Sequence, residues 1–570
     1  MILLPLIFPL LFPGVNSFTA DFTSSGNPEE LARLIVNSMS DEQALAQTFM
    51  FGWTGAGPSP LILDWIRERN IGGVKVFGWN TEDTTRLAET IGTLQTESLK
   101  GAFRIPLLVA TDQEGGWIRH VKGATSETPG NMAIGASGVP MDAYWSGYYI
   151  GRELAVLGIN MNFAPTVDLY TNRGSTLIGP RTFGVDPVKT GILGAAFVKG
   201  QQAAGLITTA KHYPGHGDTD LDSHGVLPQI KADFDVLWER ELLPYRFLVK
   251  EGIPAIMSGH LAFPNTQAGA IPASLSPWFL QDILRKRIGF KGLIITDDLM
   301  MNGATSTTGS LSKTAKQALL AGNDIVMLSG TPNLNDGIWT NLLASMKEEP
   351  GFRSRVRDAA QRVLRVKLQY IRGGTISIIP NLQRVKDSLP DPEGRDFFLN
   401  LAARSVTLVK GDFPLYPETA GKVLLAGQYE DFLKIGKLAY PDAVTYRFSP
   451  GRGTAELQRY ARDADTIIFC LSDRAGLKML ESLQTLQKRV IAFSVLSPVY
   501  LDGLDWVDGS IAVYSYSPES FISGFSAILG RLDASGKVPF PLNEPHWVSP
   551  QSSRQNQSVN RNSGQGTAGE

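Results

Sequence analysis

Short apolar runs alternate with longer amphipathic segments between about residues 40 and 330, a pattern typical of strands that are each followed by a helix. Eight runs have the length and composition of buried parallel strands, at 48–51, 74–77, 107–111, 161–164, 207–210, 255–258, 292–296 and 324–328. Helical spacing of apolar residues predicts helices over 61–69, 82–99, 187–204, 233–250, 278–288 and 311–321. Ser40-Asp41-Glu42-Gln43 resembles a capping box that starts a helix before Ala44. Eight strand-and-helix units in roughly 290 residues predict a TIM-type (β/α)8 barrel, because a doubly wound open sheet would need fewer strands.

A second block follows a predicted helix near residues 352–370. Its apolar runs lie at 422–425, 466–470, 490–495 and 510–514, and helical segments at 455–462 and 476–487 separate some of them. This pattern predicts a smaller α/β sandwich domain with a mostly parallel sheet. Gly451-Arg452-Gly453 is too short for a dinucleotide site and does not open the first strand-helix turn. We therefore divide the chain into a barrel at 27–372, a linker at 373–398 and a C-terminal α/β domain at 399–547.

The two ends of the chain have a different composition from the rest. Residues 1–12 are apolar and predict a signal peptide within 1–20 that is cleaved after Ser17, although no Lys or Arg precedes the run, two prolines interrupt it and a third follows it directly. We expect export to the periplasm or the outside, and a cytoplasmic protein if this run is no signal peptide. The run is shorter than the roughly 20 residues of a membrane helix, and no later stretch qualifies, so stable membrane insertion is not expected. Residues 548–570 are polar and predict a disordered tail.

The composition of the chain excludes several classes of function. The 570 residues suit one large domain and a smaller one. With 53 Lys and Arg against 55 Asp and Glu, the net charge of −2 gives no overall field that would attract nucleic acid. Cys470 is the one cysteine, which excludes an intrachain disulfide, a cysteine-rich zinc site and an iron–sulfur cluster.

Polar residues follow directly on several of the predicted barrel strands. In a barrel of this type the carboxyl ends of all strands meet at one face, where the functional groups lie. We therefore expect a polar pocket built from Asp112, Asn162, Asp168, Lys211, His212, His260, Asp297 and Asp298.

Residues 211–224, with the sequence KHYPGHGDTDLDSH, contain half of the six histidines of the chain. A zinc site would use His212, His216 and His224, but the Pro-Gly pair at 214–215 breaks the helix on which such a pair would share a face. An EF-hand loop starting at residue 218 fails, because Ser223 stands where Gly is needed and Gln229 where Glu is needed. The third interpretation is an acid/base loop in which Asp222 orients the imidazole of His224.

Two further segments end a strand with carboxylates. Asp112 and Glu114 point opposite ways if their strand continues, so only one of them can face the pocket, and Asp112 is favoured as an acceptor for hydroxyl groups of a sugar. Asp297 follows a fully apolar strand, where a desolvated carboxylate must be held by a partner and is poised as a nucleophile. Its neighbour Asp298 is a candidate cap for the following segment.

Together the segments resemble the family 3 glycoside hydrolases, specifically their β-N-acetylglucosaminidase branch. The motifs that carry the resemblance are Asp-Gln-Glu-Gly-Gly at 112–116, the histidine-rich segment at 211–224 and Thr-Asp-Asp-Leu-x-Met at 296–301, with weaker matches at 158–165, 178–184, 272–276 and 321–324. They stand in the order and approximate spacing of the family, and the resemblance covers roughly residues 30 to 370. The second domain matches more weakly, from about residue 402 to 410, and offers no catalytic residue.

The resemblance implies roles for individual residues. Asp297 would be the nucleophile of a retaining hydrolase, and His224, paired with Asp222, its acid/base. The contacts to the hydroxyl groups of a terminal N-acetylglucosamine would come from Asp112, Arg181, Lys211 and His212. His260 and Met301 would line the same pocket. No metal and no organic cofactor is implied, and a monomer that binds a small glycan is expected.

The leading hypothesis is an exo-acting β-N-acetylglucosaminidase on cell-wall muropeptides, as in peptidoglycan turnover, or on chitooligosaccharides. Phosphorolysis is an alternative, because a neutral histidine repels phosphate less than a carboxylate does. A β-glucosidase or xylosidase is another, although those branches lack the Asp-Ser-His loop. A sugar-binding protein without catalysis is the alternative outside enzymes.

Overall fold

The structure is a computed structural model that describes residues 20–223 and 225–543. The predicted tail at 548–570, the predicted leader up to residue 19 and the predicted acid/base His224 lie outside the described residues. Within them, no helix combines the length and the apolar character that a membrane span requires.

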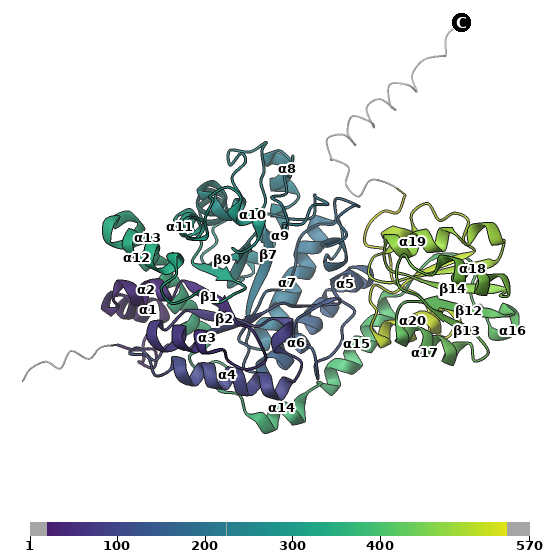
Figure 1. The fold of residues 1–570 in the computed structure, drawn as a ribbon, viewed down its shortest axis with the longest axis horizontal. Coiled ribbons are helices and arrows are strands. Elements are labelled where there is room, and N and C mark those ends of the chain that lie inside the picture. The colour runs from purple at the N-terminus through teal and green to yellow at the C-terminus, as the bar shows by residue number, and fades with distance from the viewer. Residues whose placement is uncertain (1–19, 224, 544–570) are drawn as a thin grey trace, which may run out of the picture.

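Eight parallel strands close into a barrel in the order β1-β10-β9-β8-β7-β6-β3-β2 (Figure 1). They are β1 Phe49–Gly52, β2 Gly73–Lys75, β3 Leu108–Thr111, β6 Met161–Asn162, β7 Ile207–Tyr213, β8 Ala255–Ser258, β9 Leu293–Asp298 and β10 Ile325–Leu328. Each one coincides with a predicted apolar run to within a few residues, and the TIM-type barrel is confirmed. Between β3 and the next helix, a small hairpin is formed by β4 Gln113–Gly115 and β5 Ile118–Arg119.

Helices surround the barrel, and most of them were predicted. Ser40 caps its helix as expected, accepting from the Gln43 N–H at 3.3 Å while the Gln43 side chain accepts from the Ser40 N–H at 2.9 Å. The predicted helix 233–250 is interrupted, because Pro244 lacks an N–H and fits only the first turn of a new helix. Segment 278–288 is confirmed as helical and is π-helical over Trp278–Arg287. The helices are α1 Pro28–Ser38, α2 Asp41–Ala46, α3 Pro60–Asp64, α4 Thr84–Ser98, α5 Asn131–Ser137, α6 Pro140–Val156, α7 Pro187–Ala203, α8 Phe234–Glu239, α9 Leu242–Lys250, α10 Asn302–Thr305, α11 Leu311–Ala321, α12 Gly337–Glu348 and α13 Pro350–Tyr370.

Alternate side chains of the strands pack on opposite sides of the barrel wall, as the two-residue period of a strand requires. Met50 of β1 joins the interior cluster, whereas Phe49 and Phe51 pack outward with the helix residues Trp65 and Trp339. Apolar side chains thus fill the barrel interior along its length. Polar side chains are left for the carboxyl ends of the strands, where the site is built.

The second domain is an open sheet of six strands in the order β11-β16-β15-β14-β12-β13. Neighbouring strands are parallel except β11, which pairs antiparallel with β16. The strands are β11 Thr407–Lys410, β12 Val423–Gly427, β13 Val444–Arg447, β14 Thr466–Leu471, β15 Arg489–Ser494 and β16 Gly509–Ala512. Separate apolar clusters cover the two faces, which confirms a mostly parallel sheet inside an α/β layer structure. The helices are α16 Pro417–Ala420, α17 Glu430–Ala439, α18 Thr454–Arg462, α19 Arg474–Glu481 and α20 Pro518–Ile528.

The two domains touch directly beside the segment that joins them (Figure 1). The segment 373–398, predicted as a linker, contains α14 Leu382–Ser388 and the start of α15 Pro392–Ser405. Arg404 of α15 pairs with the buried Asp142 of α6 at 2.5 Å. Tyr170 of the barrel meets Phe540 edge to face, with ring centroids 5.1 Å apart, in an apolar cluster shared by both domains.

Candidate active site

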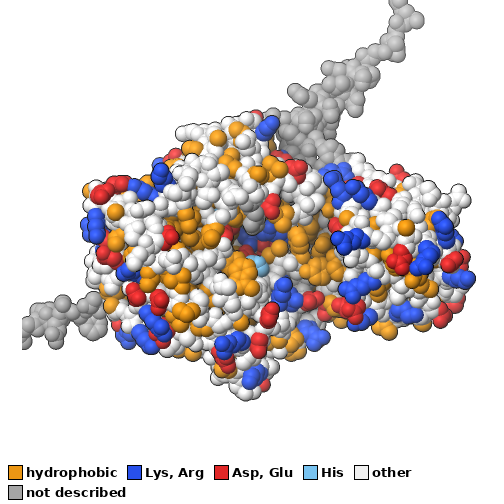
Figure 2. All heavy atoms as spheres, in the orientation of Figure 1, with side chains coloured by type: hydrophobic (Ala, Val, Ile, Leu, Met, Phe, Trp, Pro, Cys, Tyr) orange, Lys and Arg blue, Asp and Glu red, His pale blue; other side chains and the backbone are white. Residues whose placement is uncertain are grey.

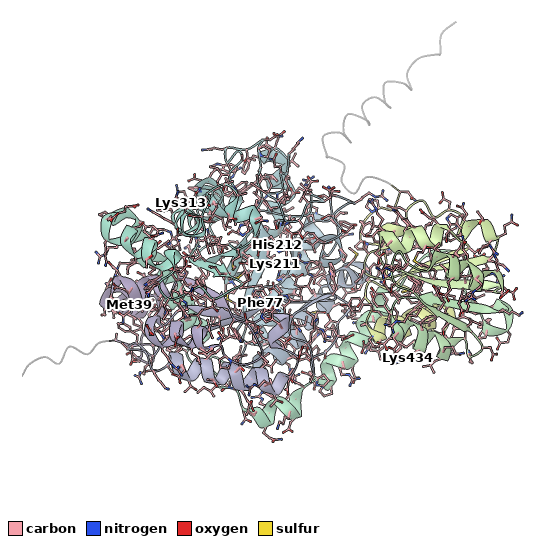
Figure 3. All side chains as sticks on the ribbon, viewed as in Figure 1. Met39, Phe77, Lys211, His212, Lys313 and Lys434 are labelled. Carbon is pink, nitrogen blue, oxygen red and sulfur yellow. The ribbon has the colours of Figure 1, made fainter. Side chains whose placement is uncertain are left out.

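The polar residues predicted at the strand ends gather at one face of the barrel. Figure 3 shows Lys211 and His212 of β7 near the middle of this face, with Phe77 beside them. Figure 2 shows a hollow here, with charged side chains inside and hydrophobic side chains around its rim. The convergence follows from barrel closure, which directs all eight carboxyl ends toward a common axis.

Asp112 stands at the end of β3 between two lysines. Lys75 Nζ lies 2.7 Å from Asp112 Oδ2, and Lys211 Nζ contacts Asp112 Oδ1. Burial acts to raise the pKa of Asp112, but the two ammonium groups hold this pKa well below its usual value. His120 Nδ1 lies 3.6 Å from the same carboxylate, and burial, with Lys75 nearby, lowers the pKa of His120 to about 4. Asp112 is therefore an ionised acceptor surrounded by donors.

Glu114 also faces the site, which corrects the prediction that only one of the two carboxylates can do so. The strand does not continue from Asp112, since β3 ends at Thr111 and the chain turns into the hairpin of β4 and β5. Arg181 donates to Glu114 from Nε at 2.9 Å and from Nη2 at 2.7 Å, a bidentate geometry. Lys211 Nζ lies 2.7 Å from Glu114 Oε1, so this lysine joins both carboxylates. Burial acts to raise the pKa of Glu114, but these cations lower it to about 2.

His212 is fixed from both of its ring nitrogens. Its Nδ1 lies 2.7 Å from the buried carboxylate of Asp168, and Arg181 Nη2 lies 3.3 Å from its Nε2. Asp168 also accepts from the His216 N–H at 2.7 Å. Because a carboxylate only accepts, the Nδ1 of His212 donates, and its Nε2 is left as an acceptor beside Arg181.

Asp297 and Asp298 at the end of β9 have different surroundings. Asp298 Oδ1 accepts from the N–H groups of Met300 and Ser329, both at 3.0 Å, and so holds the turn after the strand. Asp297 receives one hydrogen bond within the described residues, from the Asp298 N–H at 2.8 Å. The other carboxylate oxygen of Asp297 is thus left for a ligand. Burial acts to raise the pKa of Asp297, but the hydrogen bond from the Asp298 N–H and the charge of Lys211 help to hold it below its usual value.

His260 and Met301 both lie against the turn that carries Asp297. The Nε2 of His260 donates to the Asp298 carbonyl at 3.1 Å, and its Nδ1 lies 2.8 Å from the Ser274 hydroxyl. Burial lowers the pKa of His260, which keeps the ring neutral in this position. Met301 is buried, and its N–H donates to the Asp298 carbonyl at 3.0 Å. Both residues therefore bind the carbonyl of Asp298, the neighbour of Asp297 in the chain.

The loop that follows β7 carries the predicted acid/base pair. Asp222 is exposed, and its carbonyl accepts from the Gly225 N–H at 3.1 Å, while its predicted partner His224 lies outside the described residues. Asp218, at the start of the loop, is held by the buried Arg240 at 2.5 Å. Arg240 Nε is also 2.5 Å from Glu241, and burial raises the pKa of Glu241 to about 7. A buried arginine thus anchors the loop to the helical layer.

Sequence reasoning missed several members of the site. Glu114 was set aside, and Lys75 and His120 were not singled out, although both lie within 3.6 Å of Asp112. One signal was present in the sequence for Lys75, which is a charged residue inside the otherwise apolar run 74–77. His120 stands in no strand or motif, and only the hairpin after β3 brings it to the site.

A closed parallel barrel whose carboxyl face carries ionised carboxylates among lysine, arginine and histidine has the architecture of a barrel enzyme with its active site at that face. The family model described as the glycosyl hydrolase family 3 N-terminal domain matches residues 50–366. The chain belongs to glycosyl hydrolase family 3, and the predicted family is confirmed.

The chain is similar to curated relatives. It is 31% identical over 383 residues to beta-hexosaminidase A of Pseudoalteromonas piscicida, an alignment covering 62% of this chain and 62% of that protein, which is less than two thirds of its length. It is 35% identical over 265 residues to a beta-hexosaminidase of Tolumonas auensis, which covers 46% of this chain and 76% of that protein. Among solved structures, a family 3 beta-N-acetylglucosaminidase from a Paenibacillus species superposes with a TM-score of 0.83 at 26% identity, covering 90% of this chain and all of that one.

Proposed function

We propose that the protein is a retaining exo-β-N-acetylglucosaminidase that removes terminal β-linked N-acetylglucosamine from small glycans. The observation that carries the proposal is the pair at the end of β9. Asp298 is fixed by two backbone N–H groups, those of Met300 and Ser329, which both donate to its Oδ1. Among the described residues, Asp297 accepts only from the N–H of its neighbour, and it lies close enough to Lys211 and His212 to interact with them electrostatically. Similarity to beta-hexosaminidases supports the choice of sugar.

In the proposed reaction, Asp297 attacks the anomeric carbon of the terminal sugar. The bond from that carbon to the leaving oxygen breaks, and protonated His224 delivers its proton to this oxygen. A covalent glycosyl ester with Asp297 results. Neutral His224 then takes a proton from water, whose oxygen attacks the same carbon and releases Asp297, so that configuration is retained overall. We assign Asp222 the task of orienting His224 and stabilising its charged form.

The terminal sugar would be held by the ion-paired cluster. Asp112 and Glu114 offer carboxylate oxygens, and Arg181, Lys211 and His212 offer donors and an acceptor at fixed positions. Because these groups already satisfy one another, a hydroxyl can insert between a donor and an acceptor without leaving a buried charge unpaired. We propose muropeptides or chitooligosaccharides as the natural substrates.

Three measurements test the proposal. Turnover of p-nitrophenyl N-acetyl-β-glucosaminide by the purified protein is expected, and cleavage of the corresponding glucoside alone would contradict the choice of sugar. Trapping with a 5-fluoro glycosyl analogue should label the peptide containing residues 293–301, and a label elsewhere would contradict the assigned nucleophile. A rate that depends on phosphate and yields sugar 1-phosphate would show phosphorolysis in place of hydrolysis.

A further inference from the structure

Two stacked aromatic rings stand at the end of β2, beside the charged cluster. Phe77 and Trp79 are parallel to within 8°, with ring centroids 4.5 Å apart, and we call this pair the aromatic shelf. Trp79 is 52% exposed, although a tryptophan side chain is among the largest apolar groups a protein can bury. Hydrophobic burial does not account for a tryptophan that is left in the solvent.

The exposed ring of Trp79 is held in a fixed orientation. Its indole N–H donates to the Trp53 carbonyl at 2.8 Å, so the polar edge of the ring already has a partner inside the protein. One face stacks on Phe77. Asn80, in the same turn, donates to the Trp53 carbonyl at 3.1 Å and to the Gly55 carbonyl at 2.6 Å, which fixes the backbone that carries the ring. What remains exposed is a rigid apolar surface.

The aromatic shelf adjoins the residues proposed to hold the terminal sugar. Lys75 Nζ lies 4.2 Å from the centre of the Phe77 ring and 2.7 Å from Asp112. The His120 ring is 5.6 Å from Phe77. Figure 3 shows Phe77 next to Lys211 and His212, and Figure 2 shows hydrophobic side chains on the rim of the charged hollow. The shelf therefore belongs to the same face of the barrel as the proposed site.

We propose that the aromatic shelf is a binding site for the second sugar of the substrate, the one that leaves after cleavage, and that Trp79 determines the preference for a glycan leaving group. This inference rests on the proposed function. An exo-acting enzyme encloses the terminal sugar among the ionised groups, so the rest of the glycan extends toward the mouth, where Trp79 is exposed. A pyranose ring presents C–H groups on its face and hydroxyls at its edge, which suits a flat aromatic surface beside polar groups.

The test compares two substrates that differ only in the leaving group. N,N′-diacetylchitobiose has a sugar that can stack on the shelf, whereas N-acetyl-β-glucosaminyl fluoride has a single atom there. We expect Trp79→Ala to lower kcat/KM for the disaccharide about 10-fold and to leave kcat/KM for the fluoride unchanged. Trp79→Phe keeps a flat ring and should retain most of the disaccharide activity.

Trp145 provides the matched control. It is 36% exposed on α6 and packs against Tyr144, Tyr148 and Tyr149 of its own helix, so Trp145→Ala should change neither rate. Unchanged kcat/KM for the disaccharide in Trp79→Ala would overturn the inference, and so would an equal fall for both substrates, which would place the effect on the terminal sugar or on folding. Wild-type protein that cleaves neither substrate would instead refute the proposed function on which the inference rests.

Discussion

The barrel and the second domain both place parallel strands beneath helices, yet they use the ends of those strands differently. In the barrel, Asp297 is the last but one residue of β9, and among the described residues its side chain accepts only from the Asp298 N–H. In the second domain, Asp473 stands two residues after β14, and its side chain accepts from the Gly476 N–H at 2.7 Å and caps α19. An aspartate near the end of a parallel strand thus caps a helix in the second domain, whereas in the barrel it lies among the charged groups of other strand ends.

The ion pairs of the two regions also differ, in how far their side chains are exposed to solvent. Lys211 and Glu114 form their pair with side chains only 3% and 1% exposed. Among the described residues of the second domain, by contrast, Glu430 and Lys434 pair with side chains 57% and 66% exposed. Burying charge is costly and is offset only by close partners, whereas an exposed pair contributes little. The barrel face thus carries a cost that folding alone does not require, which is typical of a functional site.

The largest effect on activity should come from replacing Asp297 of the barrel, with replacement of Asp473 of the second domain as the control. Asp297→Asn should lower kcat toward N-acetyl-β-glucosaminides by about 10³-fold or more, because an amide cannot form the glycosyl ester. Steady-state kinetics with a chromogenic substrate measures this. Asp473→Asn is the matched control, since asparagine also caps helices, and should keep wild-type activity. Similar activity in both variants would remove the distinction between the two regions.

The next largest effect is on stability, and it compares the buried ion pairs of Glu114 with the exposed pair of Glu430. Glu114→Gln leaves Arg181 and Lys211 without a full countercharge in a buried site, and should lower the free energy of unfolding by about 3–5 kcal/mol. Glu430→Gln, at the exposed pair, should give no measurable change. Urea denaturation at neutral pH compares the two variants. The difference should shrink in acid, because the pKa of Glu114 is about 2 and its stabilisation is lost as the pH falls from about 4.5 toward that value.

A smaller effect tests the buried histidine beside the site. Burial lowers the pKa of His216 to about 4 from 6.5, so between these values the unfolded chain binds a proton that the folded protein does not. Its contribution to stability therefore falls as the pH drops through this window, by at most about 1.4 kcal/mol per pH unit. His216→Gln should show a shallower loss of stability between pH 6.5 and 4 in urea titrations. Parallel curves for variant and wild type would contradict a buried neutral ring.

The smallest expected effect is on stability and concerns Asp473, the residue that caps α19 in the second domain. Asp473→Ala removes the acceptor for the Gly476 N–H and should lower the free energy of unfolding by about 1 kcal/mol, with glycosidase kinetics unchanged. Denaturant unfolding and an activity assay on the same preparation measure both quantities. A loss of activity larger than the loss of folded protein would mean that the second domain takes part in the reaction.

Elements with a strong local pattern were predicted from the sequence almost to the residue. The strand at 255–258 and the helix at 311–321 have the predicted bounds, because a buried strand and a capped amphipathic helix are each encoded by neighbouring residues. Strand β13 was missed because most of its side chains are exposed and carry no apolar pattern. Helix α6 was missed as well, although its seventeen residues begin with a proline at the first position.

The sequence by itself determined the barrel, the family and the strand-end residues Asp112, Lys211 and Asp297, because periodicity and short motifs are local properties of the chain. Only the tertiary structure decided that Glu114 faces the same site as Asp112, since the end of β3 and the hairpin after it change the direction of the side chains. It also decided that Lys75, His120 and the aromatic shelf border that site. These contacts join residues far apart in the chain, and barrel closure brings them within a few ångströms of one another.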